Sequence, residues 1–75
     1  MKKQLLEQAK LLGCNVYQNS LGKWVIKGFI DKKLWILQEE KANAWLMTFD
    51  EITPTPLGIE KAVEALELFM KYRTT

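Results

Sequence analysis

The stretch KWVIKGFIDKKLWILQEEKANAWLMTF, residues 23–49, decides the fold of this chain. Within it a tryptophan is followed three times by two bulky apolar residues, as Trp24-Val25-Ile26, Trp35-Ile36-Leu37 and Trp45-Leu46-Met47. The tryptophans are eleven and then ten residues apart, and turn-forming residues lie between them. This spacing is typical of a meander, in which antiparallel strands are joined by short turns.

A shorter run of strand-forming residues precedes this stretch, so the meander is predicted to have four strands. Gly22 allows a positive φ in the first turn, and Asp31-Lys32 forms a two-residue second turn. The predicted strands are residues 14–18, 23–30, 33–40 and 44–49.

Amphipathic helices are predicted before and after the meander. In residues 2–12, apolar side chains recur at helical spacing, and Gly13 follows where a left-handed C-cap is expected. The second helix is predicted to begin with Thr55 as N-cap and Pro56 as its first residue. It runs to about Arg73 along an apolar stripe made of Ile59, Ala62, Val63, Leu66, Phe69, Met70 and Arg73.

The chain is therefore predicted to be a single α+β domain over residues 1–75, with the order helix, four-stranded antiparallel meander, helix. Both helices are expected on one face of the sheet, because two apolar stripes can be buried together against one surface. A domain this small, with one cysteine and no histidine, cannot use an internal disulfide or a Cys/His zinc site. Dense packing or self-association must stabilise it instead.

Turn length predicts which side chains share a face of the sheet. A two-residue turn at Asp31-Lys32 pairs Gly28 with Trp35, so that the indole covers the glycine. The first face then holds Val16, Trp24, Ile26, Ile30, Trp35 and Leu37. A three-residue loop at residues 41–43 adds Trp45, Met47 and Phe49 to this helix-covered face, whereas a two-residue loop puts them on the other. We favour the first alternative, because it gathers all three tryptophans into one core.

The second face is predicted to be an interaction or ligand face, because it is too apolar for a solvated surface. An exposed apolar patch larger than a few hundred Å² usually marks an interaction site. The alternative is that the registers are wrong and the face is covered within the monomer. The residues predicted for this face are Tyr17, Lys23, Val25, Lys27, Phe29, Leu34 and Ile36.

No catalytic, metal-binding or cofactor-binding residues are predicted. Without histidine, Cys14 has no imidazole to activate it, and a structural thiol is the better interpretation. Glu39-Glu40 and Asp50-Glu51 are carboxylate pairs, but neighbours on a strand point to opposite faces, so neither is predicted to be an acid–base pair. We interpret both as solvated strand ends. The chain is therefore predicted not to be an enzyme.

Two functions remain for such a domain. The first is a binding module that forms a homodimer, or binds another protein, through the second face. The second is a single-stranded nucleic-acid binder, because aromatic residues flanked by lysines can stack bases. Duplex binding is not favoured, since the net charge is only +2 and ten of the eleven basic residues are lysine. No membrane span is predicted, and the lone cysteine is consistent with a cytoplasmic location.

The order helix, antiparallel strands, helix resembles the double-stranded RNA-binding domain in topology. The predicted strands number four rather than three, however. The segment TPLGIEK, residues 55–61, also lacks the lysine cluster which that family places at the start of its second helix. A four-stranded meander followed by a long helix is also similar to the Whirly class of dimeric single-strand binders. These resemblances concern topology alone, so no residue role is taken from either family.

Overall fold

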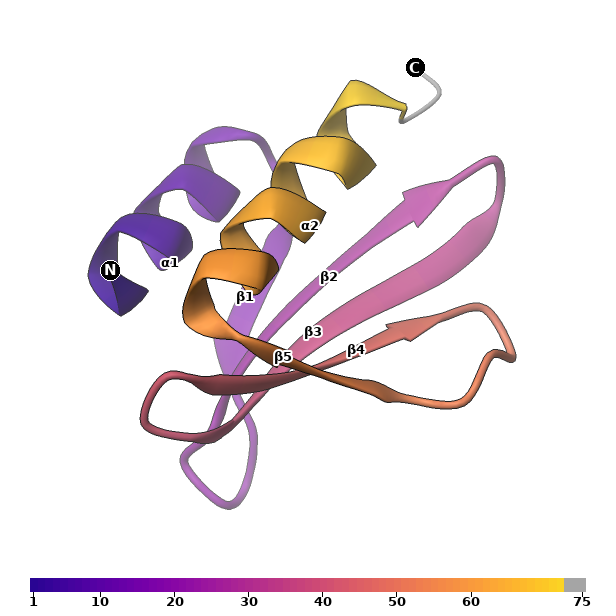
Figure 1. Ribbon diagram of the computed structural model, residues 1–75. Helices are drawn as coiled ribbons and strands as arrows, with labels where there is room; N and C mark the ends of the chain where they lie inside the picture. Colours follow the sequence, from indigo (N-terminus) through magenta and orange to yellow (C-terminus); the bar gives the residue numbers. More distant parts are fainter. Residues whose placement is uncertain (73–75) are drawn as a thin grey trace.

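The computed structural model describes residues 1–72 as a five-stranded antiparallel sheet with two helices (Figure 1). The predicted α+β class is confirmed, but the strand count of four is wrong. The strands lie side by side in chain order, as in a meander. The elements are α1 (Lys2–Leu11), β1 (Asn15–Gln18), β2 (Trp24–Ile30), β3 (Lys33–Lys41), β4 (Ala44–Phe49), β5 (Thr55–Gly58) and α2 (Ile59–Lys71).

The fifth strand occupies the segment that was predicted to begin the second helix. Thr55 pairs with Met47, and Gly58 pairs with Ala44, so this segment extends the sheet along β4. Pro56 is accommodated because β5 is an edge strand, where a missing backbone N–H is tolerated. The helix begins after Gly58, and Ile59 N–H donates to the backbone oxygen of Asn43 over 3.0 Å. The predicted end at Arg73 lies outside the described residues.

The β2–β3 hairpin has the predicted two-residue turn. Asp31 and Lys32 have φ of 50° and 67°, and two positive φ values in succession match the twist of the flanking strands. As a result Gly28 pairs with Trp35, and Ile26 pairs with Leu37. The predicted register of this hairpin is confirmed.

The β3–β4 hairpin places Trp45, Met47 and Phe49 on the helix-covered face, as favoured, but its turn is shorter than predicted. Its turn is only two residues, Ala42 and Asn43, but a bulge between Glu39 and Lys41 adds one unpaired residue. Two turn residues and one bulge residue together make three unpaired residues, which turn the side chains of β4 to the same face as the predicted three-residue loop would. Leu37 therefore pairs with Met47, and the last tryptophan, Trp45, joins the core.

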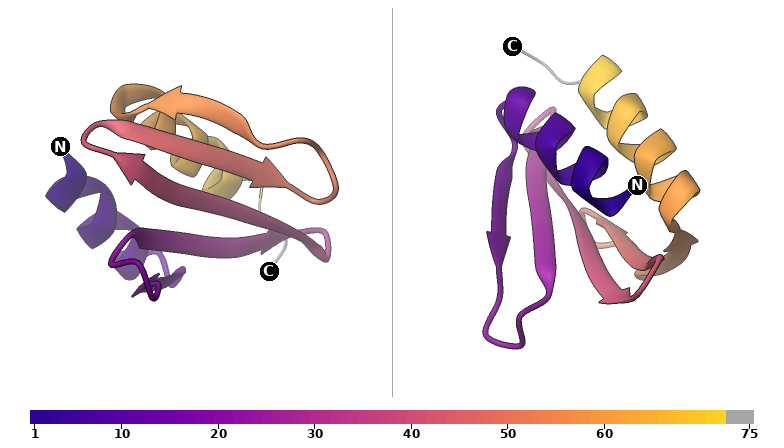
Figure 2. Two further views of the ribbon diagram at one scale, coloured as in Figure 1. Left: turned by 90° about the horizontal axis from the view of Figure 1, so that it is seen from below. Right: turned by 90° about the vertical axis from the view of Figure 1, so that its left-hand side faces the viewer.

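The core lies between the sheet and the two helices, which are on the same side of the sheet (Figure 2). From α2, the Phe69 ring stacks on the Trp35 indole with centroids 4.6 Å apart. No helix within residues 1–72 is long and apolar enough to cross a membrane. The buried cluster combines Leu5, Leu6 and Ala9 of α1, Ile59, Ala62 and Leu66 of α2, and Ile26, Trp35, Leu37 and Trp45 of the sheet.

Candidate functional site: the sheet face opposite the helices

The candidate site is the sheet face turned away from the helices, which we call the open face. The register places its residues in cross-strand rows, because side chains directly opposite one another point the same way. One row is Tyr17, Val25, Gln38, Leu46 and Pro56, and the next is Asn15, Lys27, Ile36 and Thr48. The pair Phe29 and Leu34 lies at one end of the face, and Lys41, Ala44 and Gly58 lie at the other, because Ala44 is two residues from Leu46 on β4. Viewed from below in Figure 2, the helices lie behind the sheet, and none of the described helices crosses the open face.

Six of the seven residues predicted for this face lie in these rows. The exception is Lys23, which precedes β2 and is not placed on the face by the strand register. Its backbone N–H donates to the side-chain oxygen of Asn19 over 3.0 Å, so it belongs to the β1–β2 turn.

The sequence prediction missed the part of the open face that β4 and β5 contribute. Leu46 and Thr48 alternate with the core residues Trp45 and Met47, so the alternation signal was present once the face of this strand was known. Pro56 could not be found in this way, because its segment was predicted to be helical. The open face is thus wider than predicted and spans all five strands.

Exposure varies widely across the open face. Phe29 is 63% exposed, whereas Val25 is only 3% exposed although no helix covers it. In the register Val25 lies between the longer side chains of Tyr17 and Gln38. The accessible apolar surface of the open face is therefore contributed by Phe29 and the half-buried residues Tyr17, Leu34, Ile36 and Leu46 rather than by Val25.

In its registered rows the open face carries two charges, those of Lys27 and Lys41, and no carboxylate. The Lys27 ammonium lies 5.3 Å from the centroid of the Tyr17 ring, within the range of a cation–π interaction. This contact keeps the charge over an aromatic ring while the apolar stem lies along the sheet.

The two outer strands are poorly suited to pairing with another chain. β1 and β5 are each four residues long, and β5 contains Pro56, which lacks a backbone donor. Short edges and edge prolines are common ways in which proteins prevent edge-to-edge association. A partner is therefore expected on the face of the sheet rather than at its edge.

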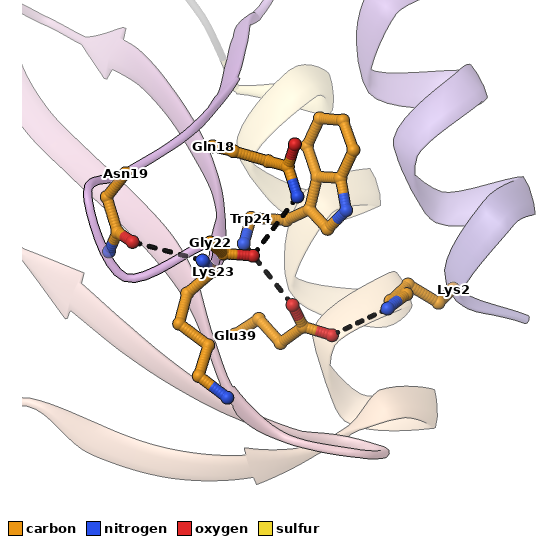
Figure 3. Close-up of polar contacts among 7 residues, drawn as sticks. All are labelled: Lys2, Gln18, Asn19, Gly22, Lys23, Trp24 and Glu39. Atoms are coloured by element: carbon orange, nitrogen blue, oxygen red, sulfur yellow. Dashed lines mark hydrogen bonds and ion pairs between the residues drawn. The ribbon is translucent and has the colours of Figure 1, made fainter.

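On the opposite, helix-covered face, Glu39 is a buried carboxylate at the end of the core. It is 6% exposed, so the interpretation of this residue as a solvated strand end was wrong. Its Oε2 accepts from the Lys2 ammonium over 2.9 Å, and its Oε1 accepts from the Trp24 backbone N–H over 3.3 Å (Figure 3). Glu39 therefore joins the start of α1 to β2 and β3.

Burial by itself would raise the pKa of Glu39. The hydrogen bonds from Lys2 and from the Trp24 backbone, together with the charges of Lys2 and Lys23, more than offset this, so the pKa lies below its ordinary value of 4.5. A carboxyl with a lowered pKa in the folded state stabilises the fold above its unfolded-state pKa. That stabilisation is lost as pH falls through the folded-state pKa.

We expect Glu39→Gln to lower the free energy of unfolding at pH 7 by about 1–2 kcal/mol, because Lys2 and the Trp24 N–H lose a charged acceptor. Part of the loss of stability on acidification below pH 4.5 should also disappear in this variant. Urea unfolding of both proteins across this pH range measures both effects. Glu40→Gln, at the exposed neighbouring residue, is the matched control and should unfold like the wild type. If Glu39→Gln lost stability with falling pH to the same extent as the wild type does, Glu39 would not be the buried, ion-paired carboxylate described here.

Within residues 1–72, no group of three or more His, Cys, Asp or Glu side chains is arranged to hold a metal ion. Comparison of the chain with protein-family models, with curated proteins and with solved structures found no match.

Proposed function

We propose that the chain is a non-enzymatic binding module that forms a homodimer through the open face. The observation that carries this proposal is a sheet face rich in apolar side chains over which no described helix packs. Burying apolar surface contributes about 25 cal/mol per Å², from which the costs of association must be subtracted. A single small domain without a disulfide gains stability from such burial.

A second copy of the chain is the partner that the open face suits best. Two copies related by a twofold axis present the same residues to each other, so a face without carboxylates brings no pair of like negative charges together. Of its two cations, Lys27 lies over the Tyr17 ring within the subunit, and Lys41 is exposed at the β3–β4 end of the face. Because β1 and β5 are only four residues long, the open face offers a larger contact surface than either edge of the sheet.

Replacing Ile36 with glutamate tests the proposal, because Ile36 lies in a central strand of the open face. We expect the wild type to be a dimer at micromolar concentrations by sedimentation equilibrium. The buried charge in Ile36→Glu should weaken association by a factor on the order of 100. Leu68→Glu is the matched control: Leu68 is 55% exposed on α2, and this change should leave the dimer intact. Circular dichroism confirms that both variants are folded.

A wild-type protein that stays monomeric at several hundred micromolar would overturn the proposal. The same samples then test the alternative, that the open face binds single-stranded nucleic acid through Tyr17, Lys27 and Phe29. A monomer that binds a single-stranded oligonucleotide at low salt, and loses binding both at high salt and in Lys27→Glu, would replace the homodimer with that function.

A further inference from the structure

A cleft of about 480 Å³ opens at the end of the sheet where β1 diverges from β2. β1 begins at Asn15, which pairs with Lys27, but β2 continues to Ile30 without a partner on that side. The chain before Asn15 turns away toward α1, and the space between it and β2 forms the cleft. Its lining residues are Gly13, Cys14, Asn15, Lys27, Gly28, Phe29, Leu34, Trp35 and Met70.

The walls of the cleft are mainly apolar and come from distant parts of the chain. Phe29 and Leu34 belong to the β2–β3 hairpin, Trp35 to the core, and Met70 to the last turn of α2. The Cys14 thiol donates to the Met70 sulfur over 3.5 Å, which joins the chain before β1 to α2. A cleft of this volume with apolar walls suits a small molecule with a ring system.

The polar groups of the cleft favour a negatively charged ligand. Among the nine lining residues, Lys27 is the one charged side chain, and none is a carboxylate. The amide of exposed Asn15 lies next to Lys27 in the register. The donors of the wall are therefore the Lys27 ammonium and the Asn15 amide, and no anionic acceptor faces them.

We propose that this cleft binds a small organic anion, in which an apolar ring lies against Phe29 and Met70 and a carboxylate pairs with Lys27. The site rests on the cleft, but Lys27 and Phe29 also belong to the open face, so ligand binding and self-association are expected to compete. Lys27 leaves its contact with Tyr17 to reach the ligand, exchanging a cation–π interaction for a charge-assisted hydrogen bond.

The test uses 2-naphthoate as probe and uncharged 2-naphthalenemethanol as its matched ligand, followed by backbone amide NMR shifts. We expect naphthoate to bind and to shift the amides of Cys14, Gly28 and Phe29 most. Lys27→Met, which keeps an apolar stem, should weaken naphthoate about tenfold and leave naphthalenemethanol unchanged. Lys33→Met is the control variant, because Lys33 is an exposed lysine outside the cleft.

Alkylation of Cys14 by N-ethylmaleimide gives an independent readout, since Cys14 lines the cleft and does not belong to the open face. At a naphthoate concentration near its dissociation constant, this reaction should slow in the wild type and slow less in Lys27→Met. Equal affinity for the acid and the alcohol, or alkylation unchanged by naphthoate, would overturn the proposal. Neither outcome bears on the homodimer, which sedimentation equilibrium tests without ligand.

Discussion

Gly28→Ala is expected to lower the free energy of unfolding by about 3 kcal/mol, at the upper end of the usual cost of overpacking. A Cβ at this position would lie 2.6 Å from Cε2 and 2.9 Å from Nε1 of Trp35, and closer still to Cζ2. The indole cannot move aside, because Trp35 is 1% exposed and stacked on Phe69. Such a loss is a large part of the total stability of a domain this small.

Urea unfolding of Gly28→Ala against Gly58→Ala measures this effect. At Gly58 a new Cβ would meet only the Asn43 oxygen at 4.0 Å, so the control should lose less than about 1 kcal/mol, mainly as a poorer N-cap. A Gly28→Ala, Trp35→Leu double variant should be more stable than the sum of its single losses predicts, because the smaller side chain makes room for the methyl group. Equal losses at the two glycines would refute the close packing of Trp35 on Gly28.

The second large effect is expected at Leu37, where substitution by alanine should cost about 3 kcal/mol. Leu37 is fully buried beneath the helices, and its neighbour Ile36 lies on the open face of the same strand. In the isolated subunit Ile36→Ala should cost about 1 kcal/mol, because the side chain is only half-buried there. The two side chains have equal volume, so the difference between the two losses of stability reports which face of the sheet each side chain occupies.

Thermal unfolding of both variants at 5 μM and at 500 μM separates packing within the subunit from packing between subunits. The loss in Leu37→Ala should be nearly independent of concentration. The loss in Ile36→Ala should grow at the higher concentration, where the wild type gains stability from association. Similar losses in the two variants at both concentrations would contradict the face assignment, and a concentration-independent Ile36→Ala would contradict the homodimer.

Much of the sheet could be predicted from the sequence because its determinants are local. Alternation along β2 and β3, with the two-residue turn at Asp31-Lys32, sets the pairing of Gly28 with Trp35 within a single hairpin. The same alternation would have placed Glu39 among the core residues. The partner that allows this charge to be buried is Lys2, which lies 37 residues away, so no local pattern predicts the ion pair.

The segment Thr55–Gly58 shows why the last strand could not be predicted. A threonine followed by proline is a good helix start, and it is also acceptable in an edge strand. The choice depends on β4, whose backbone on that side would otherwise lack a partner. Whether this segment starts the helix or forms an edge strand is therefore decided only when β4 is in place beside it.

By itself, the sequence determined the α+β class, the two amphipathic helices and the division of β2 and β3 into a core face and an open face. These features follow from side-chain periodicity and turn length, which act over a few residues. Only the tertiary structure decided the fifth strand, the Glu39–Lys2 ion pair and the cleft beside Lys27. Each of these depends on contacts between distant segments, such as Cys14 and Met70, which no local pattern encodes.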